Sequence, residues 1–358
     1  MFLINYCFKK MHRGIKVTDK VLVTGFSGFI GANISKKLLD KGYNLRGAVR
    51  NLDKANKIVD ALSASGCDTS NIELVEVELG SDAGWSDAVK DCRYIQHTAS
   101  PLPNEPPTDR EALVPEARAG AQRVLENGYS AGVEKIVMTS SIAAMTGRPH
   151  KEKVLTLNED SWSDPEWKYM TSYPISKTRA EISAWAYTEA QGLKSKLTTI
   201  CPGLVFGPDT FGNAGASLGL LKSLMIGNLA YLPKVGIPLI DVRDCASIHV
   251  SAMTSEQAGG RRLLATGETL WFKDIANILR NEFKELKKIP KSEMPNFLFK
   301  VIAMFDDRVK ILVQDLGKFY DTDSIYVNNM TKVIPRPAKQ AIIDGAHSLI
   351  ANESVRLK

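Results

Sequence analysis

Three glycines between two apolar runs place the tightest constraint on how this chain can fold. In VLVTGFSGFIGANI, residues 21–34, they stand at Gly25, Gly28 and Gly31. The Val- and Leu-rich run before them predicts a buried parallel strand, and the segment after them has the apolar spacing of a helix. A tight turn needs backbone angles that side chains disfavour, and a pyrophosphate must come close to the amides at the positive end of a helix. The stretch therefore predicts a strand, a phosphate-binding turn and a helix, with contacts expected from Gly25, Ser27, Gly28, Phe29, Ile30 and Gly31.

The same alternation of short apolar runs and helix-length segments continues along the chain. Strands are expected at 20–25, 44–50, 72–80, 94–101, 134–145 and 196–208, with a later one at 261–266. Segments of helical length lie between them, the longest at 109–131 and 171–192. Parallel strands joined by helices predict an α/β fold with a doubly wound parallel sheet of the Rossmann type.

The pattern also divides the chain into regions. We expect residues 1–15 to be a loose N-terminal extension and residues 16–206 to be the NAD(P)-binding Rossmann domain, which residues 236–266 rejoin. Residues 207–235 and 267–358 are expected to form a smaller, mostly helical substrate-binding lobe. At the junction IDVRD, we expect Asp244 to cap the following helix and the carboxylates to pair with Arg243, rather than to do acid–base chemistry.

The composition excludes several classes of protein. The 358 residues, 44% of them hydrophobic, are enough for a sizeable core. The net charge of +6 is dispersed and forms no basic stripe of the kind that binds nucleic acid. No run of about 18 apolar residues predicts a membrane span. The five cysteines are scattered and have neither CxxC nor zinc spacing. We therefore expect a cytoplasmic protein with reduced thiols and no metal, nucleic-acid or membrane partner.

The end of the second strand, AVRN, bears on the choice of cofactor. An NAD site usually places an acidic residue there to bind the ribose hydroxyls, but this chain has Val49 followed by Arg50. Lys54 and Lys57 follow at helical spacing. A guanidinium suits a 2′-phosphate, so NADPH/NADP⁺ is favoured over NADH. Whether Lys57 contacts the phosphate or only lies on a solvated helix face stays open.

Two later segments hold candidate catalytic groups. YPISK places Tyr173 and Lys177 one helical turn apart on one face. We expect the ammonium to lower the pKa of the phenol, which could then exchange a proton with a carbonyl oxygen that receives a hydride. The strand before it ends in Ser140 and Ser141, of which only one should face the site because strand side chains alternate.

The segments GFSGFIG, AVRN, HTASP, TSSIAA, YPISK, CPGLVFGP and IDVRDCASIH occur in one order along residues 18–280. In this set and order, the chain resembles the extended short-chain dehydrogenase/reductase family. The branch it looks closest to holds dihydroflavonol reductases, cinnamoyl-CoA reductases and methylglyoxal reductases. The resemblance implies a Ser141–Tyr173–Lys177 triad, with Ser140 structural and Lys177 also holding the nicotinamide ribose. It further implies cofactor contacts from Glu78, Leu79, Thr98, Ala99, Ser100, Pro202, Gly203, Leu204 and Val205, with His97 packed under the cofactor.

These features lead to one favoured function and several alternatives. The favoured one is an NADPH-dependent reductase of aldehydes or ketones, a monomer or homodimer, acting on a small apolar or aromatic carbonyl substrate. A nucleotide-sugar epimerase or dehydratase, a 3β-hydroxysteroid-type dehydrogenase and a non-catalytic dinucleotide sensor remain alternatives. Ser141 is followed by Ile142 and Ala143, so the acid pair of a dehydratase is absent. The substrate pocket is expected from residues 101–107, 143–147, 169–170 and 206–221.

Overall fold

The apolar runs form one seven-stranded sheet whose strands are all parallel. In spatial order the strands are β10 (Arg262–Ala265), β7 (Leu197–Pro202), β5 (Lys135–Thr139), β4 (Cys92–His97), β1 (Lys20–Thr24), β2 (Asn44–Val49) and β3 (Ile72–Glu76). Strand order reverses between β1 and β4, which is where sheets of this kind bind ligands, outside the carboxyl ends of the strands. The predicted doubly wound Rossmann sheet is confirmed.

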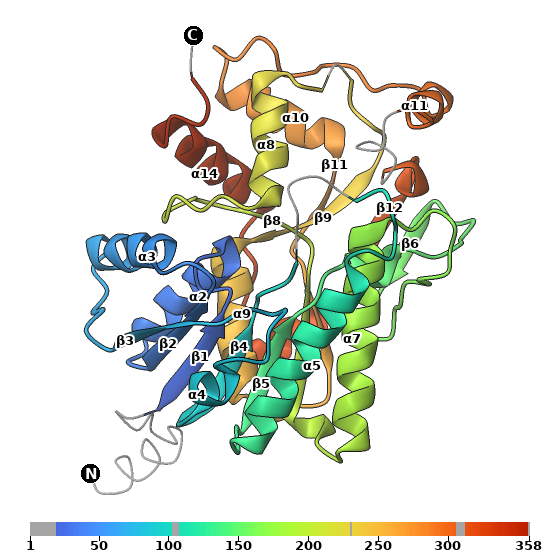
Figure 1. Ribbon diagram of the computed structural model, residues 1–358. Coiled ribbons are helices and arrows are strands. Elements are labelled where there is room, and N and C mark those ends of the chain that lie inside the picture. Colours follow the sequence, from blue (N-terminus) through green and yellow to red (C-terminus); the bar gives the residue numbers. More distant parts are fainter. Residues whose placement is uncertain (1–18, 102–106, 230, 306–311, 357–358) are drawn as a thin grey trace, which may run out of the picture.

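The structure, a computed structural model, describes residues 19–101, 107–229, 231–305 and 312–356 (Figure 1). The N-terminal extension expected at 1–15 lies outside these residues, as do residues 102–106 of the expected substrate pocket. Within the described ranges, every helix is too short or too polar to cross a lipid bilayer.

Helices cover both faces of the sheet (Figure 1). The larger apolar core joins one face to α2 (Phe29–Leu39), α3 (Leu52–Ala64) and α9 (Val242–Thr254). The second core joins the other face to α4 (Trp85–Val89), α5 (Val114–Ser130) and α7 (Ser172–Ala190). In β1, Val21 and Val23 enter the first core and Leu22 the second. A strand buried on both faces reads as a continuous apolar run, which explains the local sequence.

Most of the rest of the chain forms two small sheets and further helices at the carboxyl ends of the main strands, whereas α13 (Ile325–Thr331) packs against α9 and β10. One sheet has β8 (Leu204–Phe206), β9 (Gly236–Asp241) and β11 (Thr269–Trp271), and the other pairs β6 (Val154–Leu157) with β12 (Phe319–Thr322). The other helices of the described residues are α6 (Ala143–Thr146), α8 (Ala216–Ile226), α10 (Phe272–Glu282), α11 (Asn296–Ile302), α13 (Ile325–Thr331) and α14 (Ala338–Ala351). Short 3₁₀ turns lie at Lys194–Lys196, Glu256–Ala258 and Val313–Asp315.

Two expected helix starts are wrong. Helix α5 begins at Val114 rather than at residue 109, with a proline in its first turn. Helix α9 is capped by Asp241, whose carboxylate accepts the amide of Arg243 at 2.8 Å, and not by Asp244. Asp241 also pairs with the Arg243 guanidinium, as expected, whereas Asp244 accepts the backbone amide of Arg336 at 2.7 Å. The capping carboxylate therefore lies one turn earlier than expected.

Candidate active site

A cavity of about 520 Å³ lies at the carboxyl ends of β1 and β4, where strand order reverses. Most of the predicted site residues line this cavity. They are Gly25, Ser27, Gly28, Phe29, Ile30, Gly31, Arg50, Lys54, Leu79, Thr98, Ala99, Ser100, Ser141, Tyr173, Lys177, Pro202, Gly203 and Val205. Glu78 and Leu204 do not line it. The side chain of Glu78 is exposed, and Leu204 falls between the lining residues Gly203 and Val205, as strand alternation requires.

The glycine turn has the geometry that its sequence suggests. Gly25 has a φ of +66°, and a Cβ there would stand 2.6 Å from Thr98 Oγ1 and 2.8 Å from the amide nitrogen of Ala99. A Cβ on Gly31 would collide with the carbonyl oxygen of Gly25. Gly25 therefore makes the turn possible and Gly31 lets α2 pack on it. Gly28 is exposed to the cavity and caps α2 without a side chain.

The start of α2 suits an anionic ligand. The first helical amides lie at the positive end of the helix, where they have no intrahelical acceptor. The first turn of α2 contains no acidic side chain that would repel a phosphate. Phe29, Ile30 and Gly31, the first residues of the helix, all line the cavity. The turn therefore fits the pyrophosphate of a dinucleotide.

The cavity extends from this turn to the end of β2. Arg50 and Lys54 line it and are exposed, while Lys57 is exposed and does not line it. The side chain of Asn51 caps α3 by accepting the amide of Lys54 at 2.7 Å. The lining at this end therefore includes two cationic side chains within reach of a ligand.

Sequence reasoning missed part of this end of the cavity. Val77 and Trp85 line it beside Leu79. Trp85 is buried, and its indole N–H donates to the carbonyls of Glu78 and Ser81, each at 3.0 Å. Glu78 thus acts here through its backbone and not through its carboxylate. An aromatic residue at the start of a five-residue helix carries no sequence signal of a binding role.

The candidate catalytic side chains come together at the ends of β5 and α7. Tyr173 and Ser141 both line the cavity, and the Ser141 hydroxyl acts to lower the pKa of the Tyr173 phenol. Ser141 Oγ accepts the amide of Ala143 at 3.1 Å. Lys177 Nζ donates to the carbonyl of Thr139 at 3.2 Å. Ser140 is directed away from this cluster, since its Oγ donates to Glu181 at 2.6 Å. Ser140 also lines the cavity, but its bond to Glu181 favours the expected structural role for Ser140 and leaves Ser141 as the candidate catalytic serine.

The expected effect of Lys177 on Tyr173 is not what the structure shows. Burial raises the pKa of Tyr173 and the Ser141 hydrogen bond partly opposes this, so the phenol is a weaker acid rather than a stronger one. Burial lowers the pKa of Lys177 to about 8, although the charge of Glu181 raises it. Sequence spacing places the two side chains on one helix face but does not reveal that both are desolvated.

His97 lies at the end of β4 and is buried. Its Nδ1 is 2.7 Å from Thr24 Oγ1. Burial lowers its pKa to about 3, and the charge of Lys177 acts in the same direction. A neutral imidazole cannot donate a proton as an acid, and the ring of His97 is held by Thr24. These contacts favour the expectation that His97 packs under the cofactor and takes no part in proton transfer.

The segment after β8 closes the cavity on the remaining side. Asn213, Ala214, Gly215, Ala216 and Ser217 line it, and Asn213 Nδ2 donates to the carbonyl of Ser27 in the glycine turn at 3.2 Å. This part of the expected 206–221 substrate segment, together with Pro101, does border the cavity. Residues 143–147 and 169–170 do not. Met170 instead packs with Val114 and Ile175 in a small apolar cluster.

Comparisons with known proteins place this chain among reductases. The model of the NAD dependent epimerase/dehydratase family matches residues 21–264. The NADPH-dependent methylglyoxal reductase of Saccharomyces cerevisiae is 31% identical over 293 residues, which are 75% of this chain and 83% of the relative. Cinnamoyl-CoA reductase 1 of Oryza sativa is 31% identical over 276 residues, covering 76% and 78%.

The solved structures agree with this placement. The crystal structure of the yeast methylglyoxal/isovaleraldehyde reductase complexed with NADPH has a TM-score of 0.78 and 27% identity, over 94% of this chain and 99% of the other. The resemblance to extended short-chain reductases is thereby confirmed. This chain belongs to the NAD dependent epimerase/dehydratase family, on the branch that contains methylglyoxal reductase and cinnamoyl-CoA reductase.

Proposed function

We propose that this protein is an NADPH-dependent reductase that converts an aldehyde or ketone to an alcohol. The observation that carries the proposal is a single cavity lined at one end by Arg50 and the glycine turn and at the other by Ser141, Tyr173 and Lys177. One end suits a phosphorylated dinucleotide, and the other suits proton transfer to a carbonyl oxygen. The two relatives described above are named as reductases, and one is named as NADPH-dependent.

The cavity residues fit the parts of NADPH in order. Amides at the start of α2 would hold the pyrophosphate, and Arg50 with Lys54 would hold the 2′-phosphate. Leu79 and Trp85 would border the adenine, and Lys177 would hydrogen-bond the ribose next to the nicotinamide. When bound, NADPH supplies the hydride that reduces the substrate carbon.

Side chains of this protein would carry out the proton transfer. Tyr173 would donate its phenolic proton to the carbonyl oxygen as the carbon is reduced, and Ser141 would hydrogen-bond the same oxygen to orient it. In this proposal, a charged Lys177 one turn along α7 would stabilise the phenolate that the step leaves on Tyr173.

The cavity lining favours an uncharged substrate. Beside Ser141 the lining includes Pro202, whose carbonyl accepts the amide of Ile142, and Pro101 and Val205 add further apolar lining. The cationic lining residues Arg50 and Lys54 lie at the opposite end, where the proposal uses them for the cofactor. We therefore propose a small aliphatic or aromatic carbonyl compound as the substrate class.

The test is turnover with a panel of carbonyl compounds. Purified protein is mixed with NADPH or NADH and with methylglyoxal, isovaleraldehyde, an aryl ketone or a nucleotide sugar, and the loss of the reduced cofactor's near-ultraviolet absorbance is followed. We expect turnover with at least one small carbonyl compound, faster with NADPH, and none with the nucleotide sugar. The proposal fails if NADPH binds and no carbonyl compound is reduced.

A further inference from the structure

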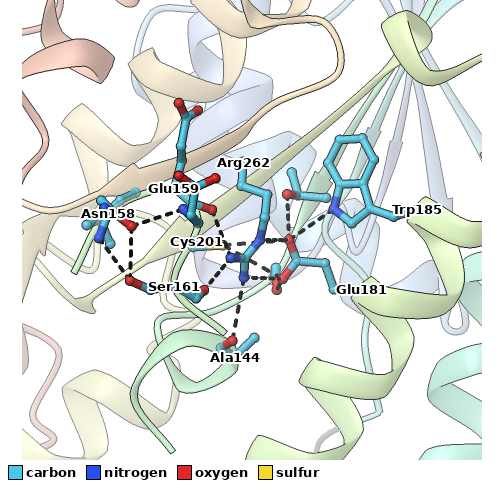
Figure 2. A network of polar contacts seen from close by, with 12 residues as sticks. Ala144, Asn158, Glu159, Ser161, Glu181, Trp185, Cys201 and Arg262 are labelled. Carbon is cyan, nitrogen blue, oxygen red and sulfur yellow. Dashed lines mark hydrogen bonds and ion pairs between the residues drawn. The ribbon is translucent and has the colours of Figure 1, made fainter. Parts of the chain in front are cut away.

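A buried carboxylate lies on α7 one turn beyond Lys177. Glu181 is fully buried, and Figure 2 shows it at the centre of a polar network. Its oxygens accept hydrogen bonds from Ser140 Oγ at 2.6 Å, from Thr199 Oγ1 at 2.6 Å and from the indole N–H of Trp185 at 3.3 Å. Tyr173, Lys177 and Glu181 follow at four-residue intervals and so lie on one helix face.

The charge opposite this carboxylate is Arg262 of β10, whose side chain is also buried. It donates from Nε at 2.8 Å and from Nη2 at 3.1 Å, so the pair is bidentate. Burial by itself would raise the pKa of Glu181, but Arg262 and the hydroxyl donors outweigh it and hold that pKa below its usual value. Glu181 is therefore ionised.

Arg262 is in turn fixed by several groups. Its guanidinium also donates to the carbonyls of Glu159 and Ser161 and reaches that of Ala144 in α6 at 3.5 Å (Figure 2). It also lies 3.5 Å from the ring centroid of Trp162. Such a fully satisfied pair is rigid, because neither partner can move without exposing a buried charge.

The network contacts the proposed active site at two points. Through Ser140 it holds the end of β5 that carries Ser141. Through the negative charge of Glu181 it raises the pKa of Lys177. The titratable groups that interact with Lys177 come from three elements: Glu181 shares its helix, Cys201 lies on β7 and His97 lies on β4. Of these three, Glu181 is the carboxylate, and its charge raises the pKa of Lys177.

We propose that Glu181, fixed by Arg262, is a positioning residue that supplies the buried negative charge opposing Lys177 and holds the strand end that carries Ser141. The proposal rests on the function proposed above, in which Lys177 acts as an ammonium. Burial already lowers the pKa of Lys177 to about 8, so loss of the carboxylate would leave much of this lysine neutral near neutral pH.

The test measures the charge of Lys177 directly in the protein without cofactor. Brief acetylation with acetic anhydride at a series of pH values, followed by mass spectrometry of the peptide that contains Lys177, gives the midpoint of its titration. The reagent can reach this side chain because Lys177 lines the cavity. The variant is Glu181→Gln, which keeps the shape and removes the charge. The matched control is Glu189→Gln on the same helix, where the carboxylate is exposed and pairs with Lys194.

We expect the midpoint for Lys177 to fall by about one to three pH units in Glu181→Gln and to stay unchanged in Glu189→Gln. The alkaline limit of kcat/KM should move in the same direction. Because Glu181→Gln leaves Arg262 without its partner, it can fail to fold, and the double variant Glu181→Gln/Arg262→Gln then replaces it. An unchanged midpoint in a folded variant would overturn the proposal, as would the failure of both variants to fold, which would show a structural role alone.

The labelling also separates this inference from the proposed function. It uses neither cofactor nor substrate, so it reports the charge of Lys177 even if no carbonyl compound is reduced. A shifted midpoint without any reductase activity would support the role of Glu181 in setting the charge and refute the function. Reductase activity in Glu181→Gln with an unshifted pH profile would support the proposed function and refute the role of Glu181 in setting the charge of Lys177.

Discussion

Gly31 offers a sharp test of why the turn before α2 contains glycines. A Cβ at this position would collide with the carbonyl oxygen of Gly25, and would lie 2.9 Å from the carbonyl carbon of Gly25 and 3.1 Å from Thr98 Oγ1. Two of these three atoms belong to the backbone, so no side-chain rotation can relieve the contact. We therefore expect Gly31→Ala to push the start of α2 away from the turn.

The expected change in the free energy of unfolding of Gly31→Ala follows from two opposing effects. Alanine is preferred over glycine in a helix by about 1 kcal/mol, whereas overpacking a closely packed position costs about 1–3 kcal/mol. With backbone atoms in the way, the upper part of that range applies, and the free energy of unfolding should fall by about 1–2 kcal/mol. The amides proposed to hold the pyrophosphate move with the helix, so NADPH affinity should fall about tenfold, which corresponds to about 1.4 kcal/mol.

Urea unfolding and fluorescence titration with NADPH measure the two effects. The matched control is Gly219→Ala, the same substitution inside α8, where a Cβ meets no atom within 4 Å. That variant should be more stable by up to about 1 kcal/mol and should bind NADPH normally. If Gly31→Ala unfolds at the wild-type urea concentration and binds NADPH as tightly as the wild type, then close packing does not explain this glycine.

Three further outcomes are expected. Arg50→Glu should weaken NADPH binding about 10–100-fold and leave NADH binding nearly unchanged, because only NADPH has the 2′-phosphate; equal losses in fluorescence titrations would contradict this. Burial lowers the pKa values of His97 and His249 to about 3, against about 6.5 in an unfolded chain, so each should remove about 1.4 kcal/mol of stability per unit as pH falls from about 6.5 towards 3. Urea unfolding at several pH values measures this loss, and His249→Gln should flatten it. Asp241→Ala should cost about 1 kcal/mol more than Asp241→Asn, since asparagine still caps α9; equal thermal unfolding of the two variants would refute the capping role.

The parts of the fold that sequence predicts well are those set by local pattern. The strands of the main sheet are buried on both faces and therefore stand out as apolar runs, as in β1. The pairing of β6 with β12 was not predicted. Each of these strands has four residues, and they come from distant parts of the chain. Nothing in either segment indicates its partner.

In the candidate site, too, the features set by local pattern were the ones that the sequence predicted. Spacing was enough to bring Tyr173, Lys177 and the serine pair at the end of β5 to one cavity, because a helix face and a strand end fix where their side chains emerge. The choice of Ser141 over Ser140 came from the family resemblance. Spacing did not predict that Glu78 points to solvent or that Leu204 faces away from the cavity. The raised pKa of Tyr173 depends on burial by residues far away in the sequence, which a local pattern cannot show.

The central claim is that Tyr173 supplies the proton in carbonyl reduction, and one substitution tests it most directly. Tyr173→Phe removes only the hydroxyl and should lower kcat about 10²–10⁴-fold with the best carbonyl substrate, while the Kd for NADPH changes little. Tyr169→Phe is the matched control, since Tyr169 is exposed and does not line the cavity. Near wild-type kcat in Tyr173→Phe, with the control also active, would contradict the account.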